Sequence, residues 1–206
     1  MSVGLKPRSA WVPRNSDKLS APMYRFTVQQ YRRMVETGIL SENDMVELLE
    51  GWIVAKMTHN PPHDAAVNLT RCVIEPLLAS GWHVRVQSAI TTGDSEPEPD
   101  IAVVRGSLRR YVQSHPRPAD IGLLIEVAET SLLEDRIDKG RLYARARIPI
   151  YWIVNIPERQ VEIYTDPKGG KSPAYRRRHD YGINDKLPLV IDGQEIARIA
   201  VKSCLP

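Results

Sequence analysis

Two acidic residues and one lysine combine residue types and surroundings that favour chemistry. Asp100 precedes the apolar segment 101–104, Glu126 lies inside the apolar segment 121–128, and Lys139 ends the sequence Asp-Arg-Ile-Asp-Lys. An ionised carboxylate in apolar surroundings is costly unless a cation or hydrogen bonds compensate it. Two such acids offer the oxygen ligands that Mg²⁺ or Mn²⁺ prefers, and a bound divalent cation can activate water. The set therefore predicts a metal-dependent hydrolytic site.

The elements around the two acids decide whether they can meet. Pro99 fixes the backbone before Asp100 and places this acid at the beginning of a strand, whereas Glu126 lies late in its own strand. If the two strands are antiparallel neighbours, the carboxylates meet at one edge of the sheet. The alternative for Asp100 is an ion pair with a nearby arginine. Lys139 either points back at the acids from the following helix or forms a surface pair with Asp135, four residues earlier.

Apolar periodicity and turn residues predict an α/β domain with a mixed sheet and hairpin extensions. Helices are predicted between Thr27 and Gly38, over 64–79 and over 132–147. Strands are predicted over 82–90, 101–104, 121–128 and 150–155, with hairpins over 46–57 and 161–178. The core order is helix, three strands, helix, strand, with one right-handed crossover through the second core helix.

Length and charge limit the kind of partner. A chain of 206 residues suits one domain, here residues 24–206, preceded by a basic arm over residues 1–23 that we expect to be flexible. The net charge of +3 neither requires nor excludes a nucleic acid. The basic segments 105–117 and 166–178 could supply the counter-charge that a phosphodiester substrate needs. Solvated loops are the alternative for both segments.

The cysteines and the apolar runs indicate a cellular location. Cys72 and Cys204 show no metal-ligand spacing, so we expect no disulfide framework and a reducing compartment. No apolar run approaches the roughly 18 residues of a membrane span. The first residues contain no apolar signal segment. We therefore expect a cytoplasmic protein without membrane partners.

Two histidines and a further acid could extend the site. His59 and His63 are four residues apart, a spacing that binds zinc on a helix. Pro61 and Pro62 lie between them and prevent a shared regular helical face, so a zinc site is not predicted. His63 either approaches the acids from the start of the helix or is a capping or loop residue. Glu47, in the first hairpin, is either a third acid or a charge at the hairpin edge.

Other acidic and aromatic residues near these segments are not predicted to take part in the site. Glu96 and Glu98 lie in the loop before the first acid, and we expect both to be solvated. Trp52, Trp82 and Trp152 occupy apolar strand positions, which favours core packing over base stacking.

A longer set of motifs surrounds the two acids. The most specific block, from Leu124 to Asn155, contains Leu-Ile-Glu-Val-Ala-Glu-Thr-Ser, Asp-Arg-Ile-Asp-Lys and Leu-Tyr-Ala-Arg-Ala-Arg-Ile-Pro-Ile-Tyr-Trp-Ile-Val-Asn. Glu-Pro-Asp, Pro-Pro-His and Val-Glu-Leu-Leu-Glu-Gly-Trp-Ile-Val extend the similarity over about residues 25–195. These segments resemble the Uma-two family of putative restriction endonucleases, which belongs to the PD-(D/E)xK nuclease superfamily.

The resemblance implies a restriction-endonuclease-like fold and the hydrolysis of DNA phosphodiester bonds with Mg²⁺ or Mn²⁺. It implies that Asp100 and Glu126 hold the metal ion and that Lys139 is the catalytic lysine. It also implies supporting catalytic roles for Glu47 and His63. A homodimer is expected, because cutting both DNA strands with one site in each subunit favours two-fold symmetry.

Ala128 departs from the superfamily pattern, in which a lysine lies two residues after the second acid. The family moves this lysine onto the next helix, and Lys139 matches that position. The departure also favours a rival function, a non-catalytic nucleic-acid-binding or regulatory protein on the same fold. A hydrolase of another phosphate ester is a second rival, which would bind metal but ignore DNA.

Overall fold

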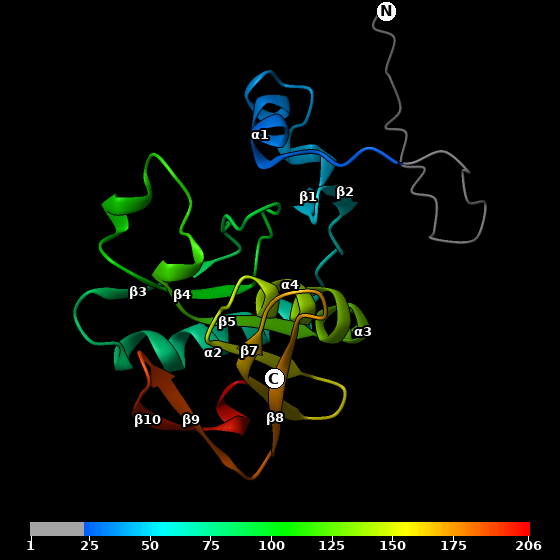
Figure 1. The fold of residues 1–206 in the computed structure, drawn as a ribbon. Coiled ribbons are helices and arrows are strands. Elements are labelled where there is room, and N and C mark those ends of the chain that lie inside the picture. Colours follow the sequence, from blue (N-terminus) through cyan, green and yellow to red (C-terminus); the bar gives the residue numbers. More distant parts are fainter. Residues whose placement is uncertain (1–22) are drawn as a thin grey trace, which may run out of the picture.

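A six-stranded mixed sheet forms the centre of the molecule (Figure 1). The computed structural model describes residues 23–206, so the arm predicted over residues 1–23 lies, apart from Met23, outside the described residues. The strand order is β3-β4-β5-β6-β7-β8, and only β5 and β6 are parallel neighbours. The strands are β3 (Trp82–Val86), β4 (Ile101–Arg105), β5 (Ile121–Ala128), β6 (Ile150–Asn155), β7 (Gln160–Lys168) and β8 (Ala174–Gly182).

Strand β5 lies inside the sheet and is buried along its whole length. Its apolar sequence suits this place, because a central strand with both faces covered needs apolar side chains on both. The parallel pair β5 and β6 requires a crossover connection. That crossover consists of α3 (Leu132–Glu134), a π-helical segment (Asp135–Lys139) and α4 (Gly140–Arg145).

Different elements cover the two faces of the sheet (Figure 1). Helix α2 and the hairpin of β9 and β10 share one apolar core with the sheet, and α4 packs into the other core through Leu142 and Tyr143. None of the helices in the described part of the chain is long and apolar enough to span a membrane. The bounds are α2 (Pro61–Ile74), β9 (Lys186–Ile191) and β10 (Gln194–Ala200).

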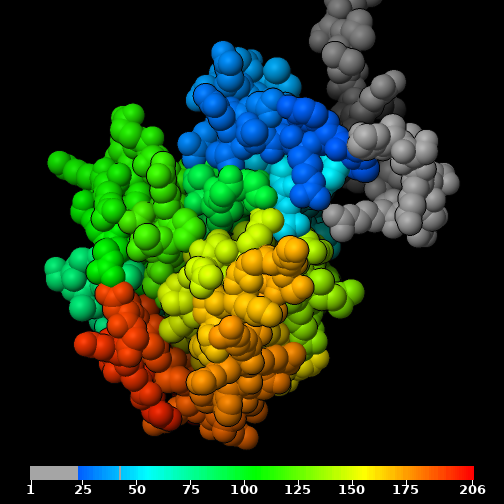
Figure 2. Space-filling view, viewed as in Figure 1, coloured from blue at the N-terminus to red at the C-terminus, as the bar shows by residue number. Residues whose placement is uncertain are grey.

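A smaller unit of α1, β1 and β2 packs over the loop that precedes β4. Tyr31 of α1 joins Val46 and Leu48 of β1 in a third apolar cluster. The N–H of Glu96 donates to the carbonyl of Leu48 at 2.8 Å, which attaches this unit to the loop. Figure 2 shows the unit, blue to cyan, against the green segments of the chain. The bounds are α1 (Val28–Glu36), β1 (Val46–Leu49) and β2 (Trp52–Ala55). Short 3₁₀ turns lie at Glu42–Asp44, Glu75–Leu77, Leu108–Tyr111, Pro118–Asp120 and Val201–Ser203.

The predicted α/β class and the mixed sheet are confirmed, whereas several element ends differ from the predictions. The strand predicted over 82–90 ends at Val86, where Gln87 adopts a left-handed backbone conformation with φ 43°. Helix α2 begins three residues earlier than predicted, at Pro61, because the first positions of a helix need no N–H partner. It ends at Ile74 and continues only as a 3₁₀ turn.

Two parts of the fold were not predicted. The helix predicted over 132–147 is interrupted by the π-helical segment and ends at Arg145. The hairpin of β9 and β10 was missed, because Pro188 interrupts the strand pattern there. Of the tryptophans predicted to be core residues, Trp152 is fully buried, and the other two are partly buried.

Glu162 on β7 ties the π-helical segment to the sheet. Its buried carboxylate accepts hydrogen bonds from Arg136 Nε at 3.1 Å, Asn155 Nδ2 at 2.9 Å and Tyr164 Oη at 2.6 Å. Burial on its own raises the pKa of Glu162, but these donors outweigh it and lower the pKa to about 2. Arg136 lies three residues before Lys139. The network therefore fixes the segment that carries this lysine.

Replacing Glu162 with glutamine is expected to lower the free energy of unfolding by about 2 kcal/mol at neutral pH, because its donors lose a charged acceptor. The pKa of Glu162 in the folded state lies below its ordinary value of 4.5. Its stabilisation is therefore present above about pH 4.5 and is lost as the pH falls toward about 2. Urea unfolding of wild type and Glu162→Gln across this range should show the difference shrinking in acid.

Glu158→Gln is the matched control, because Glu158 is exposed and contacts the same arginine at 3.3 Å. It should change the free energy of unfolding by less than about 1 kcal/mol. A difference between wild type and Glu162→Gln that stays constant with pH would contradict the stabilising role of the buried charge.

Candidate active site

The two acids singled out in the sequence meet where β4 begins and β5 approaches its end. Ile101 pairs with Ile125 in antiparallel register, so Asp100 lies opposite Glu126. The N–H of Asp100 donates to Glu126 Oε2 at 3.3 Å, and the N–H of Val127 donates to Asp100 Oδ2 at 2.8 Å. Each carboxylate is thus held by the backbone of the other strand. The predicted antiparallel arrangement is confirmed, and the alternative arginine pair of Asp100 is not formed within the described residues.

Lys139 reaches the acids from the crossover between β5 and β6. The N–H of Gly140 bonds to the carbonyl of Asp135, five residues earlier, as in a π-helical turn. Lys139 is buried, with Nζ 3.0 Å from Glu126 Oε1. It is therefore not the surface residue that the spacing from Asp135 allowed. Tyr143 donates its hydroxyl to the same oxygen of Glu126 at 2.6 Å.

Glu47 and His63 complete the cluster from distant parts of the chain. Glu47 on β1 has Oε1 3.5 Å from Lys139 Nζ, and its Oε2 accepts the N–H of Glu98 at 2.8 Å. His63, in the first turn of α2, has Nε2 3.2 Å from Asp100 Oδ2. Both side chains are buried. The structure thus brings all five residues named from the sequence to one place.

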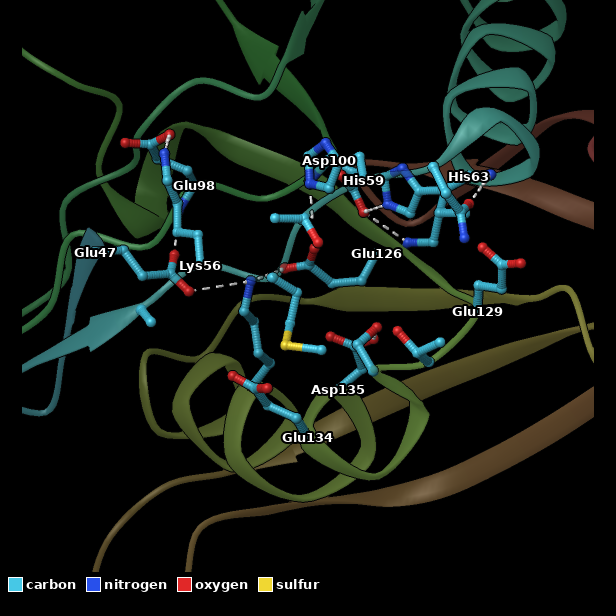
Figure 3. A pocket seen from close by; sticks show the side chains of 18 residues that line it. Glu47, Lys56, His59, His63, Glu98, Asp100, Glu126, Glu129, Glu134 and Asp135 are labelled. Carbon is cyan, nitrogen blue, oxygen red and sulfur yellow. Dashed lines mark hydrogen bonds and ion pairs between the residues drawn. The ribbon is translucent and has the colours of Figure 1, made fainter. Parts of the chain in front are cut away.

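A small cavity of about 80 Å³ lies at this cluster. Figure 3 shows Glu47, Asp100, Glu126 and His63 around it. Carboxylates dominate its lining, which includes Glu47, Glu98, Asp100, Glu126, Glu129, Glu134 and Asp135. Lys139 and Lys56 also line it, and Lys56 Nζ bonds to Glu98 Oε2 at 2.6 Å. Oxygen ligands in excess over cationic side chains are the donor set of a hard divalent cation.

The charges of the cluster follow from burial and from the contacts. Burial raises the pKa of Asp100, but the hydrogen bonds from His63 and Val127 outweigh it, so the pKa is lowered. Burial lowers the pKa of Lys139, but its carboxylate neighbours outweigh it and keep the ammonium charged. For Glu126, burial raises the pKa in spite of the attraction to Lys139. One ammonium therefore offsets the cost of burying these acids only in part.

The sequence analysis did not identify Tyr143 as part of the site, and it wrongly predicted that Glu96 is solvated. Tyr143 lies four residues after Lys139, and this helical spacing was the signal that could have identified it. Glu96 was predicted to be solvated, but it is buried and forms an ion pair with Arg32 of α1. No local pattern reveals a partner 64 residues away. Glu98, also predicted to be solvated, is only partly exposed.

The mixed sheet and the acids at the junction of two antiparallel strands define a restriction-endonuclease-like α/β protein. The model of the Uma2 family, described as "Putative restriction endonuclease", matches residues 28–197, so the chain belongs to this family. The crystal structure of a putative nuclease belonging to DUF820 from Anabaena variabilis ATCC 29413 is similar, with a TM-score of 0.60 and 16% sequence identity. The alignment covers 82% of this chain and 94% of that chain, and it supports the fold alone. No curated protein matches this chain.

Replacing Lys139 with methionine is expected to lower the free energy of unfolding by about 3 kcal/mol or more, because Glu126 and Glu47 lose their buried cation. Urea unfolding of both proteins in metal-free buffer measures this loss.

Lys56→Met is the matched control, because Lys56 is partly exposed and its pair with Glu98 contributes less than about 1 kcal/mol. If both variants lose the same free energy of unfolding, the buried ammonium of Lys139 does not stabilise the fold more than an exposed ion pair does.

Proposed function

We propose that this protein is a metal-dependent endonuclease that hydrolyses DNA phosphodiester bonds. The observation that carries the proposal is the meeting of Asp100, Glu126 and Lys139 at one acid-lined cavity. Membership of a family described as putative restriction endonucleases supports the same reaction class. A protein that only binds nucleic acid needs basic surface, whereas buried acids repel phosphate unless a cation lies between them.

The donor atoms fit Mg²⁺ or Mn²⁺, with Asp100 and Glu126 as the ligands. The hydrogen bonds from Val127 and His63 both fall on Asp100 Oδ2, which leaves Oδ1 for a cation. Glu126 Oε2 accepts only a long hydrogen bond of 3.3 Å from the described residues. When bound, such an ion lowers the pKa of a water molecule and neutralises charge on the phosphate.

Lys139 supplies a fixed positive charge beside the metal ligands. Its contacts with Glu126 and Glu47 hold the ammonium in place, so it needs no rearrangement during the reaction. There it stabilises the negative charge that develops on the phosphate oxygens. Tyr143 and His63 are positioning residues, because each bonds to one of the two acids.

The basic segments 105–117 and 166–178 are assigned to the DNA backbone. Arg109 and Arg177 are exposed and form no ion pair within the described residues, whereas several other arginines of these segments pair with nearby acids. Exposed cations of this kind bind phosphates by releasing counterions. A two-fold homodimer would place one site at each DNA strand.

The decisive test is cleavage of supercoiled DNA, linear DNA and RNA in the presence of Mg²⁺ or Mn²⁺. Wild type should cut DNA, and a chelator should stop it. Glu126→Gln and Lys139→Met should each lower the rate by at least about 100-fold, because they remove a metal ligand and a transition-state charge. Glu75→Gln is the matched control, since Glu75 is an exposed acid paired with Arg71 on α2. Circular dichroism checks that each variant is folded.

Each departure from this pattern has a distinct meaning. If folded Lys139→Met cleaves DNA at the wild-type rate, the lysine has no part in the mechanism, whereas the proposed metal site is unaffected by that result. Cleavage of RNA alone would replace the assigned substrate. Metal binding without cleavage of any nucleic acid would indicate a hydrolase of another phosphate ester. If calorimetry detects neither Mg²⁺ nor Mn²⁺ binding, catalysis is wrong and the non-catalytic alternative holds.

A further inference from the structure

A second group of metal-ligand side chains lies beside the acids, at the start of α2. It consists of His59, His63 and Asp64, whose ligand atoms all lie within 4.8 Å of one another. Asp64 Oδ1 is 3.5 Å from Nδ1 of His63 and 3.9 Å from Nδ1 of His59. Ligands around a tetrahedral metal ion with bonds of about 2.1 Å are about 3.4 Å apart. These distances are close to those of a metal site, but the rings of His59 and His63, stacked at an interplanar angle of 18°, must turn out of the stack before both can direct a nitrogen lone pair at one ion.

The two prolines that argue against this site in the sequence do not prevent it in the structure. Pro61 and Pro62 occupy the first two positions of α2, where a missing N–H costs nothing. His59 lies before the helix, and its ring stacks on that of His63 with centroids 4.3 Å apart. Figure 3 shows both histidines next to Asp100. The pair therefore forms without a shared helical face.

The burial of His63 also suits a ligand. The residue is 8% exposed, and its buried Nδ1 forms no well-aligned hydrogen bond with a described residue and faces Asp64 Oδ1 at 3.5 Å. Buried polar atoms are normally paired. Its other ring nitrogen, Nε2, contacts the carboxylate of Asp100 at 3.2 Å. An N–H given to a carboxylate leaves the lone pair on the opposite nitrogen, and metal-ligating histidines have this arrangement.

We propose that His59, His63 and Asp64 bind a late first-row transition-metal ion of the Zn²⁺ or Co²⁺ type, at a site separate from the carboxylate site. Two imidazoles and one carboxylate favour such ions over Mg²⁺. The two sites are linked, because His63 also contacts Asp100. Gln87 Nε2 lies 2.9 Å from His59 Nδ1 and gives up this contact when the ion binds. Both side chains are exposed, so water compensates the amide at little cost.

The test is titration of the full chain with Co²⁺, followed by calorimetry and by visible absorption. A Cys72→Ser background removes an exposed thiol that could compete for the ion. We expect one Co²⁺ ion with the strong visible absorption of a four- or five-coordinate site, distinct from the weakly absorbing octahedral Co²⁺ that the carboxylate site would take. His59→Ala and Asp64→Asn should each weaken binding by at least about tenfold, since even indirect support of a metal ligand is worth this much. His179→Ala, which removes an exposed histidine of β8, should bind like wild type. Gln87→Ala should bind equally or more tightly.

Glu126→Gln separates this site from the proposed catalytic one. It should keep the Co²⁺ absorption while weakening Mg²⁺ binding. Loss of the Co²⁺ absorption in Glu126→Gln would place the ion at the acids and overturn the inference. Unchanged Co²⁺ affinity in both His59→Ala and Asp64→Asn would overturn it as well. The presence or absence of DNA cleavage does not affect either readout.

Discussion

The buried ammonium of Lys139 is the interaction on which the rest of the site depends. It lies between Glu126 of β5 and Glu47 of β1 and is itself carried by the crossover after β5. Removing such ionisable groups from water is costly, and good geometry among them is what makes the burial tolerable. Because the three groups come from separate elements, the need to pair them also fixes how the first hairpin and the crossover lie against the sheet.

Sheet topology explains why the acids and the lysine come to one edge. Antiparallel pairing brings the start of β4 beside the later part of β5, and each acid is held by a backbone N–H of the opposite strand. The parallel neighbour β6 requires a crossover helix that begins close to where β5 ends. Glu162 then anchors this helix through Arg136, so the lysine has little freedom to leave the acids.

Local patterns were sufficient for the strands that carry the acids, since an apolar run with one embedded carboxylate is visible without knowledge of the fold. That Asp100 and Glu126 lie close together was inferred only from the assumption that their strands are antiparallel neighbours. The role of Lys139 could not be decided locally, because a surface pair with Asp135 has the same spacing. The pair of Arg32 with Glu96 depends on a chain reversal that propensity does not encode, and the stacked pair of His59 with His63 depends on how the chain enters α2. Residues of the hairpin of β9 and β10 pack into the core that α2 shares with the sheet, a contact that the hairpin's own sequence does not reveal.

The π-helical segment has a consequence for how such a site can arise. A π turn contains one residue more than the α-helical turn that it replaces. Because the extra residue is accommodated within that one turn, a single inserted codon redirects the side chains of the turn while the helix continues beyond it. Lys139 closes this segment, and Tyr143 follows it on the same face toward Glu126. A small change of length would thus be enough to bring a lysine on this helix to the acids while the strand position two residues after Glu126 is left to Ala128.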